Sequence, residues 1–226
     1  MSLYFILLLV SGGVPLLLSF DKRLQFFKQW KYLFPSILII AFIYLLFDIN
    51  LTNSGAWGFN SRYLSGIEFF KLPLEEYCFF FVIPYASIFL HETITEYFPK
   101  LKLNKKSSTL ILIAFIILSL SIALLNIHKS YTFYIFLKTS VALTLALILK
   151  SEVIRSYFIT FLIILIPFML VNGILTGSFI ENEVVWYNDN ENLGSRIFTI
   201  PIEDFAYAFS MILLNLLMIE QLKKLY

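Results

Sequence analysis

Long runs of apolar residues, separated by short polar segments, dominate the chain. Seven of these runs approach the roughly 20 residues that an α-helix needs to cross the hydrocarbon core of a bilayer. They lie near residues 3–20, 33–49, 72–91, 108–126, 131–149, 156–174 and 201–219. The first run has no basic leading segment, so we expect a spanning helix there and not a cleaved signal peptide. The pattern predicts an all-α, polytopic membrane protein with about seven transmembrane helices.

The composition excludes a soluble domain. Hydrophobic residues occupy 59% of the 226 positions and aromatic residues 18%, whereas charged residues contribute only 14%. The mean hydropathy of +0.83 is also far above that of soluble proteins. The net charge of +2 comes from basic residues scattered through the polar segments, so we expect no nucleic-acid partner. The single cysteine, Cys78, excludes an intrachain disulfide and a cysteine-based metal cage.

The distribution of Lys and Arg predicts the orientation in the membrane. The segments after the first, third and fifth runs, together with the C-terminus, hold twelve of the seventeen basic residues. The segments after the even-numbered runs hold only Arg62, Lys71, Lys129 and Arg196. By the positive-inside bias, we expect a multi-pass protein of the cell (inner) membrane with a non-cytoplasmic N-terminus and a cytoplasmic C-terminus.

One motif occurs twice in the chain. The first copy contains P-L-E-E-Y-C-F-F from Pro73, and the second contains P-I-E-D-F-A-Y from Pro201. Aligning the two prolines also aligns residues of the preceding loops, namely Asn60 with Asn188, Gly66 with Gly194, and Phe70 with Phe198. Two adjacent carboxylates follow each proline: Glu75 and Glu76 in the first copy, Glu203 and Asp204 in the second.

The duplication extends beyond the motif. The stretch from Asp48 to Ser54 matches the stretch from Asn172 to Ser178, so the second apolar run corresponds to the sixth. We therefore expect two parallel three-helix repeats joined by a linking transmembrane helix. The repeats comprise residues 1–100 and 129–226, and the linking helix lies in residues 101–128. Sites in repeat-built membrane proteins lie at the repeat interface, so the four acids are expected to approach one another there.

The acids have a structural and a functional interpretation. Pro73 and Pro201 suit the first turn of a helix, where a carboxylate interacts favourably with the helix dipole. In the structural interpretation, the acids only stabilise helix starts at the membrane interface. Acids inside a membrane are costly and usually mark functional sites, and here the whole pattern is duplicated. The duplication favours the functional interpretation, in which Glu75, Glu76, Glu203 and Asp204 are catalytic.

Several residues near the acids are candidates for substrate binding. Aromatic faces stabilise cations, and the aromatic residues beside the acids are Tyr77, Phe79, Phe80, Phe205 and Tyr207. The aligned Asn60 and Asn188 and the intramembrane Lys138 complete the candidates. Lys138 either extends its stem to the membrane surface or faces the carboxylates and compensates their charge. His91 and His128 lie at different helix ends, and we predict no metal site.

The two motifs, each preceded by a loop that contains Asn and Gly, resemble those of the integral-membrane lycopene cyclase family. In that family, two small homologous subunits form a heterodimer in some bacteria and are fused into one chain in archaea, other bacteria and fungi. This chain resembles the fused form over nearly its whole length. The resemblance implies that the family's conserved acids correspond to Glu75, Glu76, Glu203 and Asp204.

The resemblance also implies a reaction. The acyclic end group of lycopene takes up a proton, the resulting carbocation closes a six-membered ring, and loss of a second proton gives the β-ring. Buried carboxyl groups are suited to both proton transfers, and aromatic faces shield the cation. The reaction involves no net redox change, so we expect no cofactor. The expected partners are lycopene or a related carotenoid and the lipid bilayer, and a homo-oligomer is compatible with the sequence.

Other functions are also compatible with parts of the pattern. Repeats with intramembrane acids and one lysine are typical of transporters and proton-conducting proteins, although here the acids cluster at one end of their helices. A carotenoid- or lipid-binding protein without catalysis would not need the acids. An isoprenoid-diphosphate transferase would need an Asp-rich metal-binding motif, which the sequence lacks.

Overall fold

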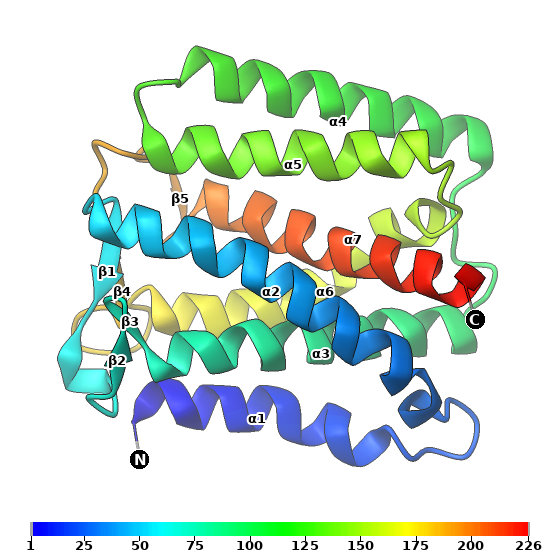
Figure 1. The fold of residues 1–226 in the computed structure, drawn as a ribbon, viewed down its shortest axis with the longest axis horizontal. Coiled ribbons are helices and arrows are strands. Elements are labelled where there is room, and N and C mark those ends of the chain that lie inside the picture. Colours follow the sequence, from blue (N-terminus) through cyan, green and yellow to red (C-terminus); the bar gives the residue numbers. More distant parts are fainter. Residues whose placement is uncertain (1, 226) are drawn as a thin grey trace.

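Seven α-helices make up most of the computed structural model, which describes residues 2–225, and they lie side by side along one axis (Figure 1). Their bounds are α1 Leu3–Leu18, α2 Trp30–Asn53, α3 Leu74–Tyr97, α4 Lys105–Leu125, α5 Ser130–Ile148, α6 Ile154–Leu175 and α7 Ile202–Leu225. By length and composition six of them are able to cross a membrane, and α1, with 16 residues, is a shorter apolar helix. The all-α, multi-pass fold predicted from the apolar runs is thus confirmed.

Several helices extend beyond the apolar runs that predict them. Helix α2 continues to Asn53, α3 to Tyr97 and α7 to Leu225. A hydropathy window ends where charged residues begin, but the backbone hydrogen bonds of a helix continue into the polar region next to the membrane. The apolar runs therefore locate the helices but underestimate the length of these three.

The remaining elements are short and lie mainly in the two loops that carry the motifs. The strands are β1 Trp57–Phe59, β2 Glu68–Phe69, β3 Leu72–Pro73, β4 Val185–Tyr187, β5 Arg196–Ile197 and β6 Ile200–Pro201. Two 3₁₀ helices cover Phe26–Gln29 and Ser61–Tyr63. Strands β2 and β3 form one hairpin, and β5 and β6 form another, so each motif enters its helix from a hairpin.

The helices pack in matching pairs. Helix α1 packs against α3 as α5 packs against α7, and α2 packs against α7 as α3 packs against α6. Helix α4, which links the two halves of the chain, lies outside this arrangement and packs mainly against α5 (Figure 1). Successive helices alternate in direction, so each helix of the set α1, α2 and α3 points the same way as its counterpart in the set α5, α6 and α7 (Figure 1). Both motif loops therefore lie at the same end of the bundle. We propose that these matching contacts reflect the two parallel repeats expected from the sequence.

The two motif loops pair with each other in a reciprocal way. Strand β1 is antiparallel to β4, with Trp57 opposite Tyr187. The backbone N–H of Asn60 donates to the carbonyl of Val184 at 2.9 Å, and that of Asn188 donates to the carbonyl of Ala56, also at 2.9 Å. The aligned Phe70 and Phe198 both have positive φ, 51° and 55°, as do Gly66 and Gly194. The two copies of the motif therefore have the same local backbone.

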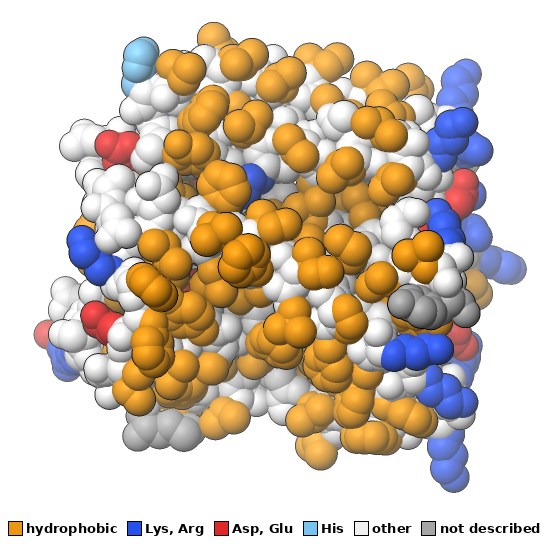
Figure 2. Space-filling view, viewed as in Figure 1, with side chains coloured by type: hydrophobic (Ala, Val, Ile, Leu, Met, Phe, Trp, Pro, Cys, Tyr) orange, Lys and Arg blue, Asp and Glu red, His pale blue; other side chains and the backbone are white. Residues whose placement is uncertain are grey.

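The surface has the polarity expected of a membrane protein. Hydrophobic side chains cover the middle of the face shown in Figure 2, and Lys and Arg gather at the end where α2 begins and α7 ends. Exposed apolar residues on the helices include Phe42 (65%), Leu125 (82%) and Ile166 (65%). The basic end lies opposite the two motif loops (Figures 1 and 2).

Candidate active site

All four motif acids lie in the first turn of a long helix and are buried. Pro73 and Pro201 end the strands β3 and β6, and α3 and α7 begin at the next residue. The fixed φ of proline suits this position, and the pairing of each hairpin fixes the direction in which the helix starts. The helix starts point the acids into the interior, where none of the four is more than 5% exposed.

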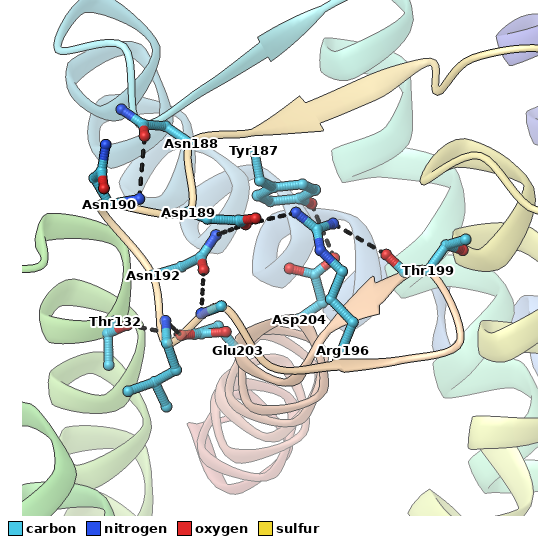
Figure 3. Close-up of polar contacts among 12 residues, drawn as sticks. Thr132, Tyr187, Asn188, Asp189, Asn190, Asn192, Arg196, Thr199, Glu203 and Asp204 are labelled. Atoms are coloured by element: carbon cyan, nitrogen blue, oxygen red, sulfur yellow. Dashed lines mark hydrogen bonds and ion pairs between the residues drawn. The ribbon is translucent and has the colours of Figure 1, made fainter.

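Glu75 and Glu203 have equivalent surroundings. Each accepts two hydrogen bonds at one oxygen, one from a hydroxyl at the start of the first helix of its half and one from a backbone N–H of its own loop. The donors are Ser2 Oγ (2.7 Å) and Ser65 N (2.6 Å) for Glu75, and Thr132 Oγ1 (2.7 Å) and Leu193 N (2.8 Å) for Glu203. Figure 3 shows Glu203 in this position, directed towards Thr132. These two acids join a loop to two helices.

Glu76 and Asp204 have different surroundings. The hydroxyl of Tyr4 donates to Oε2 of Glu76 at 2.6 Å, and no other protein donor to Glu76 is present among residues 2–225. Asp204 accepts three hydrogen bonds, from Tyr131 Oη (2.6 Å), Asn172 Nδ2 (2.8 Å) and Tyr187 Oη (2.9 Å). Residues that the sequence places far apart therefore meet at these two carboxyl groups.

A fifth buried carboxyl group is that of Asp48, a residue near the end of α2 whose side chain is fully buried. Its Oδ2 accepts a hydrogen bond of 2.7 Å from Tyr207, and its Oδ1 has no hydrogen-bond partner among the described residues 2–225. Asp48, Glu76 and Asp204 are close enough for their charges to interact. We call these three groups the carboxylate cluster; it combines α2 and α3 of the first half with α7 of the second.

Lys138 lies beside this cluster. Its ammonium nitrogen is buried and has no hydrogen-bond partner within residues 2–225. The nitrogen lies 4.3 Å from the ring centroid of Tyr44, 4.6 Å from that of Tyr207 and 5.1 Å from that of Phe47. It is also close enough to Asp48 for the two charges to interact. The ammonium group thus faces the interior, as in the charge-compensating interpretation of the sequence, and it does not extend to the surface.

The structure brings some of the predicted aromatic residues to the cluster. Phe80 is fully buried, with its ring centroid 6.3 Å from that of Tyr44 and 6.4 Å from that of Tyr207. Phe79 lies next to Tyr4, with 6.3 Å between the ring centroids. Phe79, Phe80 and Tyr207 therefore form part of the aromatic surroundings of the acids.

Four other predicted residues lie elsewhere. Tyr77 donates to the backbone carbonyl of Phe69 at 2.9 Å, and Phe205 packs against Phe168 with ring centroids 5.1 Å apart. The two aligned asparagines have a structural role in their loops. Asn60 accepts a hydrogen bond from the N–H of Arg62 at 3.1 Å, and Asn188 accepts one from the N–H of Asn190 at 3.1 Å.

A layer of polar contacts in the second motif loop covers Asp204 (Figure 3). Arg196 donates to Asp189 at 2.7 Å and to the carbonyl of Thr199 at 3.1 Å, and its guanidinium lies 5.7 Å from the ring centroid of Tyr187. The hydrogen bond from Arg196 lowers the pKa of Asp189. Burial, and after it the charge of Asp204, raises the pKa of Tyr187 well above the usual value, so Tyr187 stays protonated and able to donate.

The two histidines lie away from the cluster. Nδ1 of the buried His91 is 2.7 Å from Oγ1 of Thr160, a contact that joins α3 to α6, and His128 lies in the turn before α5. Within residues 2–225, no three His, Cys, Asp or Glu side chains are grouped in a way that could hold a metal ion.

Sequence reasoning did not identify several residues of the site. The sequence points to Asp48 only through the match of Asp48–Ser54 with Asn172–Ser178, although an acid inside a spanning segment is itself a signal of a functional site. The donors Tyr4, Tyr131 and Tyr187 gave no comparable signal, because tyrosine is common at both membrane interfaces. The alignment of Asp48 with Asn172 is the one sequence feature that points to these positions, because both residues lie beside the motif acids in the structure.

The fold and the site define a class: a multi-pass membrane protein with a buried cluster of carboxyl groups between two similarly folded halves. The sequence model of the lycopene cyclase family matches residues 1–94 and 128–222. The chain therefore belongs to the lycopene cyclase family, which confirms the resemblance seen in the motifs. The unmatched residues between the two segments include α4. Neither the curated proteins nor the solved structures contain a match.

Membership of this family supports a role in carotenoid cyclisation, and it implies a carotenoid as the substrate. The six long apolar helices indicate a lipid environment for the protein.

Proposed function

We propose that the protein is a lycopene β-cyclase that forms rings by proton transfer between buried carboxyl groups. The observation that carries the proposal is that Glu76 and Asp204, one from each copy of the motif, are both buried, each accept a hydrogen bond from a tyrosine, and lie close enough for their charges to interact. Acids that only stabilise helix starts need no contact with the other half of the chain. Here the acids of the two halves are near enough to interact.

The hydrogen bonds suggest different roles for the two acids. Asp204 accepts three hydrogen bonds, an arrangement that suits a carboxylate and therefore a general base. Glu76 has a single phenol donor and lies one helical turn from Phe79 and Phe80 on α3, surroundings that suit a protonated carboxyl and therefore a general acid. In this assignment, Glu76 gives its proton to the end group and Asp204 removes a different proton after ring closure.

The aromatic residues have a second role in the proposal. Between the two proton transfers the substrate carries a positive charge, which water would capture. The rings of Phe80, Tyr44 and Tyr207 lie around the cluster and present faces that attract a cation. Their burial keeps bulk water away from the intermediate.

The proposed reaction is an isomerisation of the hydrocarbon. One proton enters and one leaves, so lycopene passes through γ-carotene to β-carotene with no change in oxidation state. The mechanism therefore needs no electron donor or acceptor. After each turnover a proton must return from the base to the acid, and each acid accepts a hydrogen bond from a phenol, Glu76 from Tyr4 and Asp204 from Tyr131.

We also propose an orientation in the membrane. Both motif loops lie at the end opposite the one where most of the Lys and Arg side chains gather (Figures 1 and 2). By the positive-inside bias, the basic end faces the cytoplasm and the carboxylate cluster lies near the non-cytoplasmic side of the inner membrane.

Expression in a lycopene-accumulating host tests the function directly. We expect the extracted pigment to shift from lycopene to γ-carotene and β-carotene, as identified by chromatography and absorbance. Purified protein in liposomes should give the same products without added nucleotide, flavin or divalent metal. Unchanged lycopene in cells that contain the folded protein would contradict the proposal, and proton flux through the liposomes would then favour a transport function.

A further inference from the structure

A long groove runs along the outside of the helix bundle between α2, α5 and α7. Its volume is about 400 Å³, and nearly all of its lining is apolar. Along α5 the lining extends from Tyr134 to Leu149, the residue that caps the end of the helix, which corresponds to about 22 Å along the helix axis at 1.5 Å per residue. The groove is thus parallel to the helices and covers most of the roughly 30 Å thickness of a hydrocarbon core.

The groove is open to the lipid. Ile43 on α2 and Val141 on α5 form part of its lining and are 41% and 49% exposed. An apolar molecule dissolved in the bilayer is therefore able to enter from the side, without crossing water.

The groove also adjoins the carboxylate cluster through residues that contact both. Tyr44 and Lys138 belong to its lining, and both contact Tyr207, the phenol that donates to Asp48. Phe47 lines the groove at the end nearer the motif loops, and the next residue in the chain is Asp48. The stem of Lys138 therefore lies at the point where the apolar groove meets the acids.

From this geometry we propose that the groove holds the rigid polyene stem of the substrate, with one end group directed past Phe47 to the carboxylates. A groove of this length, parallel to the helices, suits a stiff conjugated chain better than a flexible acyl chain. The rings of Phe47 and Tyr134 offer flat contact surfaces for it. The inference rests on the proposed function for the identity of the substrate. It adds the place where the polyene binds and the direction from which it enters.

Bulky substitutions in the groove test the proposal. Ile43→Trp and Val141→Trp fill the groove from two different helices. Leu46→Trp and Leu147→Trp are matched controls, because these residues lie on the same two helices, are exposed, and do not line the groove. The assay uses lycopene as the probe and measures the polyene absorbance that each purified, washed protein retains.

We expect both groove variants to retain about tenfold less lycopene than the wild type, which corresponds to the cost of overfilling a packed site, and both controls to retain the wild-type amount. Equal melting temperatures of the groove and control variants would exclude a folding defect as the cause of the lost lycopene. Equal lycopene retention by the groove and control variants would overturn the proposal. A change of oligomeric state without loss of lycopene would assign the groove to a second copy of the chain, and would also overturn it.

The outcomes separate this inference from the proposed function. Normal ring formation by both groove variants would show that the groove is not the substrate site, while the cyclase function stands. Groove-dependent retention of lycopene by a wild-type protein that forms no rings would support the groove and remove the cyclase function.

Discussion

Glu75 and Glu76 are neighbours in the chain, yet their carboxyl groups have different environments. Successive residues of a helix point about 100° apart. Both carboxyl groups are buried, but that of Glu75 faces its own loop and that of Glu76 faces the carboxylate cluster. Glu203 and Asp204 repeat this division. At the residue scale, each motif thus contributes one acid with loop and helix donors and one acid in the carboxylate cluster.

This division predicts different effects of amide substitutions. Glu76→Gln and Asp204→Asn should each lower the rate of ring formation by roughly a hundredfold or more, because the transferable proton or the negative charge is lost. Glu75→Gln and Glu203→Gln retain an oxygen acceptor and should instead cost about 1–3 kcal/mol of stability. Ring formation measured per folded protein, together with the melting temperature, distinguishes the two effects. Wild-type rates in all four variants would show that the carboxylate mechanism is wrong.

Lys138 and Asp48 extend the site beyond the motifs. A buried ammonium group and a buried carboxyl with a free oxygen are both costly, and each lowers the cost of the other. Lys138→Met should therefore reduce activity and stability together, since Asp48 loses its nearby positive charge. The variant Lys138→Met with Asp48→Asn should recover stability but not activity, as measured by melting and pigment analysis. Independent effects of the two substitutions on stability would mean that the two groups are not coupled.

At the scale of the elements, the short helix α1 depends on close packing against α3. A Cβ atom added at Gly12 would lie 2.8 Å from Cγ1 of Val82, whereas one added at Gly13 would meet nothing within 4 Å. Small residues allow helices to approach closely in a membrane, where packing and not hydrophobic burial drives association. Because Ser2 and Tyr4 near the start of α1 donate to Glu75 and Glu76, this packing also positions the acids.

The adjacent glycines provide a matched test of that packing. Gly12→Leu should destabilise the protein by about 1–3 kcal/mol, because the side chain has no space against α3. Gly13→Leu has the same helix propensity and should leave the melting temperature of the detergent-solubilised protein unchanged or slightly raised. Equal destabilisation by both substitutions would indicate that α1 does not pack on α3 through Gly12.

At the scale of the whole molecule, the reciprocal pairing of β1 with β4 requires the two motif loops to lie on the same side of the membrane. Reporter fusions after Lys106 and Lys224 should give cytoplasmic signals, and insertions at Asn53 and Asn190, one for each motif loop, should give external ones. If every reporter gave the opposite signal, the protein would have the inverse orientation in the membrane, and the fold would be unchanged. A cytoplasmic signal from only one motif loop would be incompatible with the pairing of the two loops.

The sequence by itself determined the class of fold, the number of helices and the positions of the motif acids. Hydropathy is a local property, and a run of about 20 apolar residues has only a helix as a stable solution inside a membrane. The duplicated Pro and acidic residues also pointed to the family, and the match of the family's sequence model to residues 1–94 and 128–222 confirms it.

Only the tertiary structure decided which groups surround each acid. The rotation of a helix about its own axis depends on its neighbours, so the sequence did not show that Glu76 faces Tyr4 or that Asp204 faces Tyr131 and Asn172. It also ranked Asn60 and Asn188 with the site, although both stabilise their own loops. Asp48, Tyr187 and the interior position of Lys138 depend on contacts between residues far apart in the chain, and no local pattern specifies such contacts.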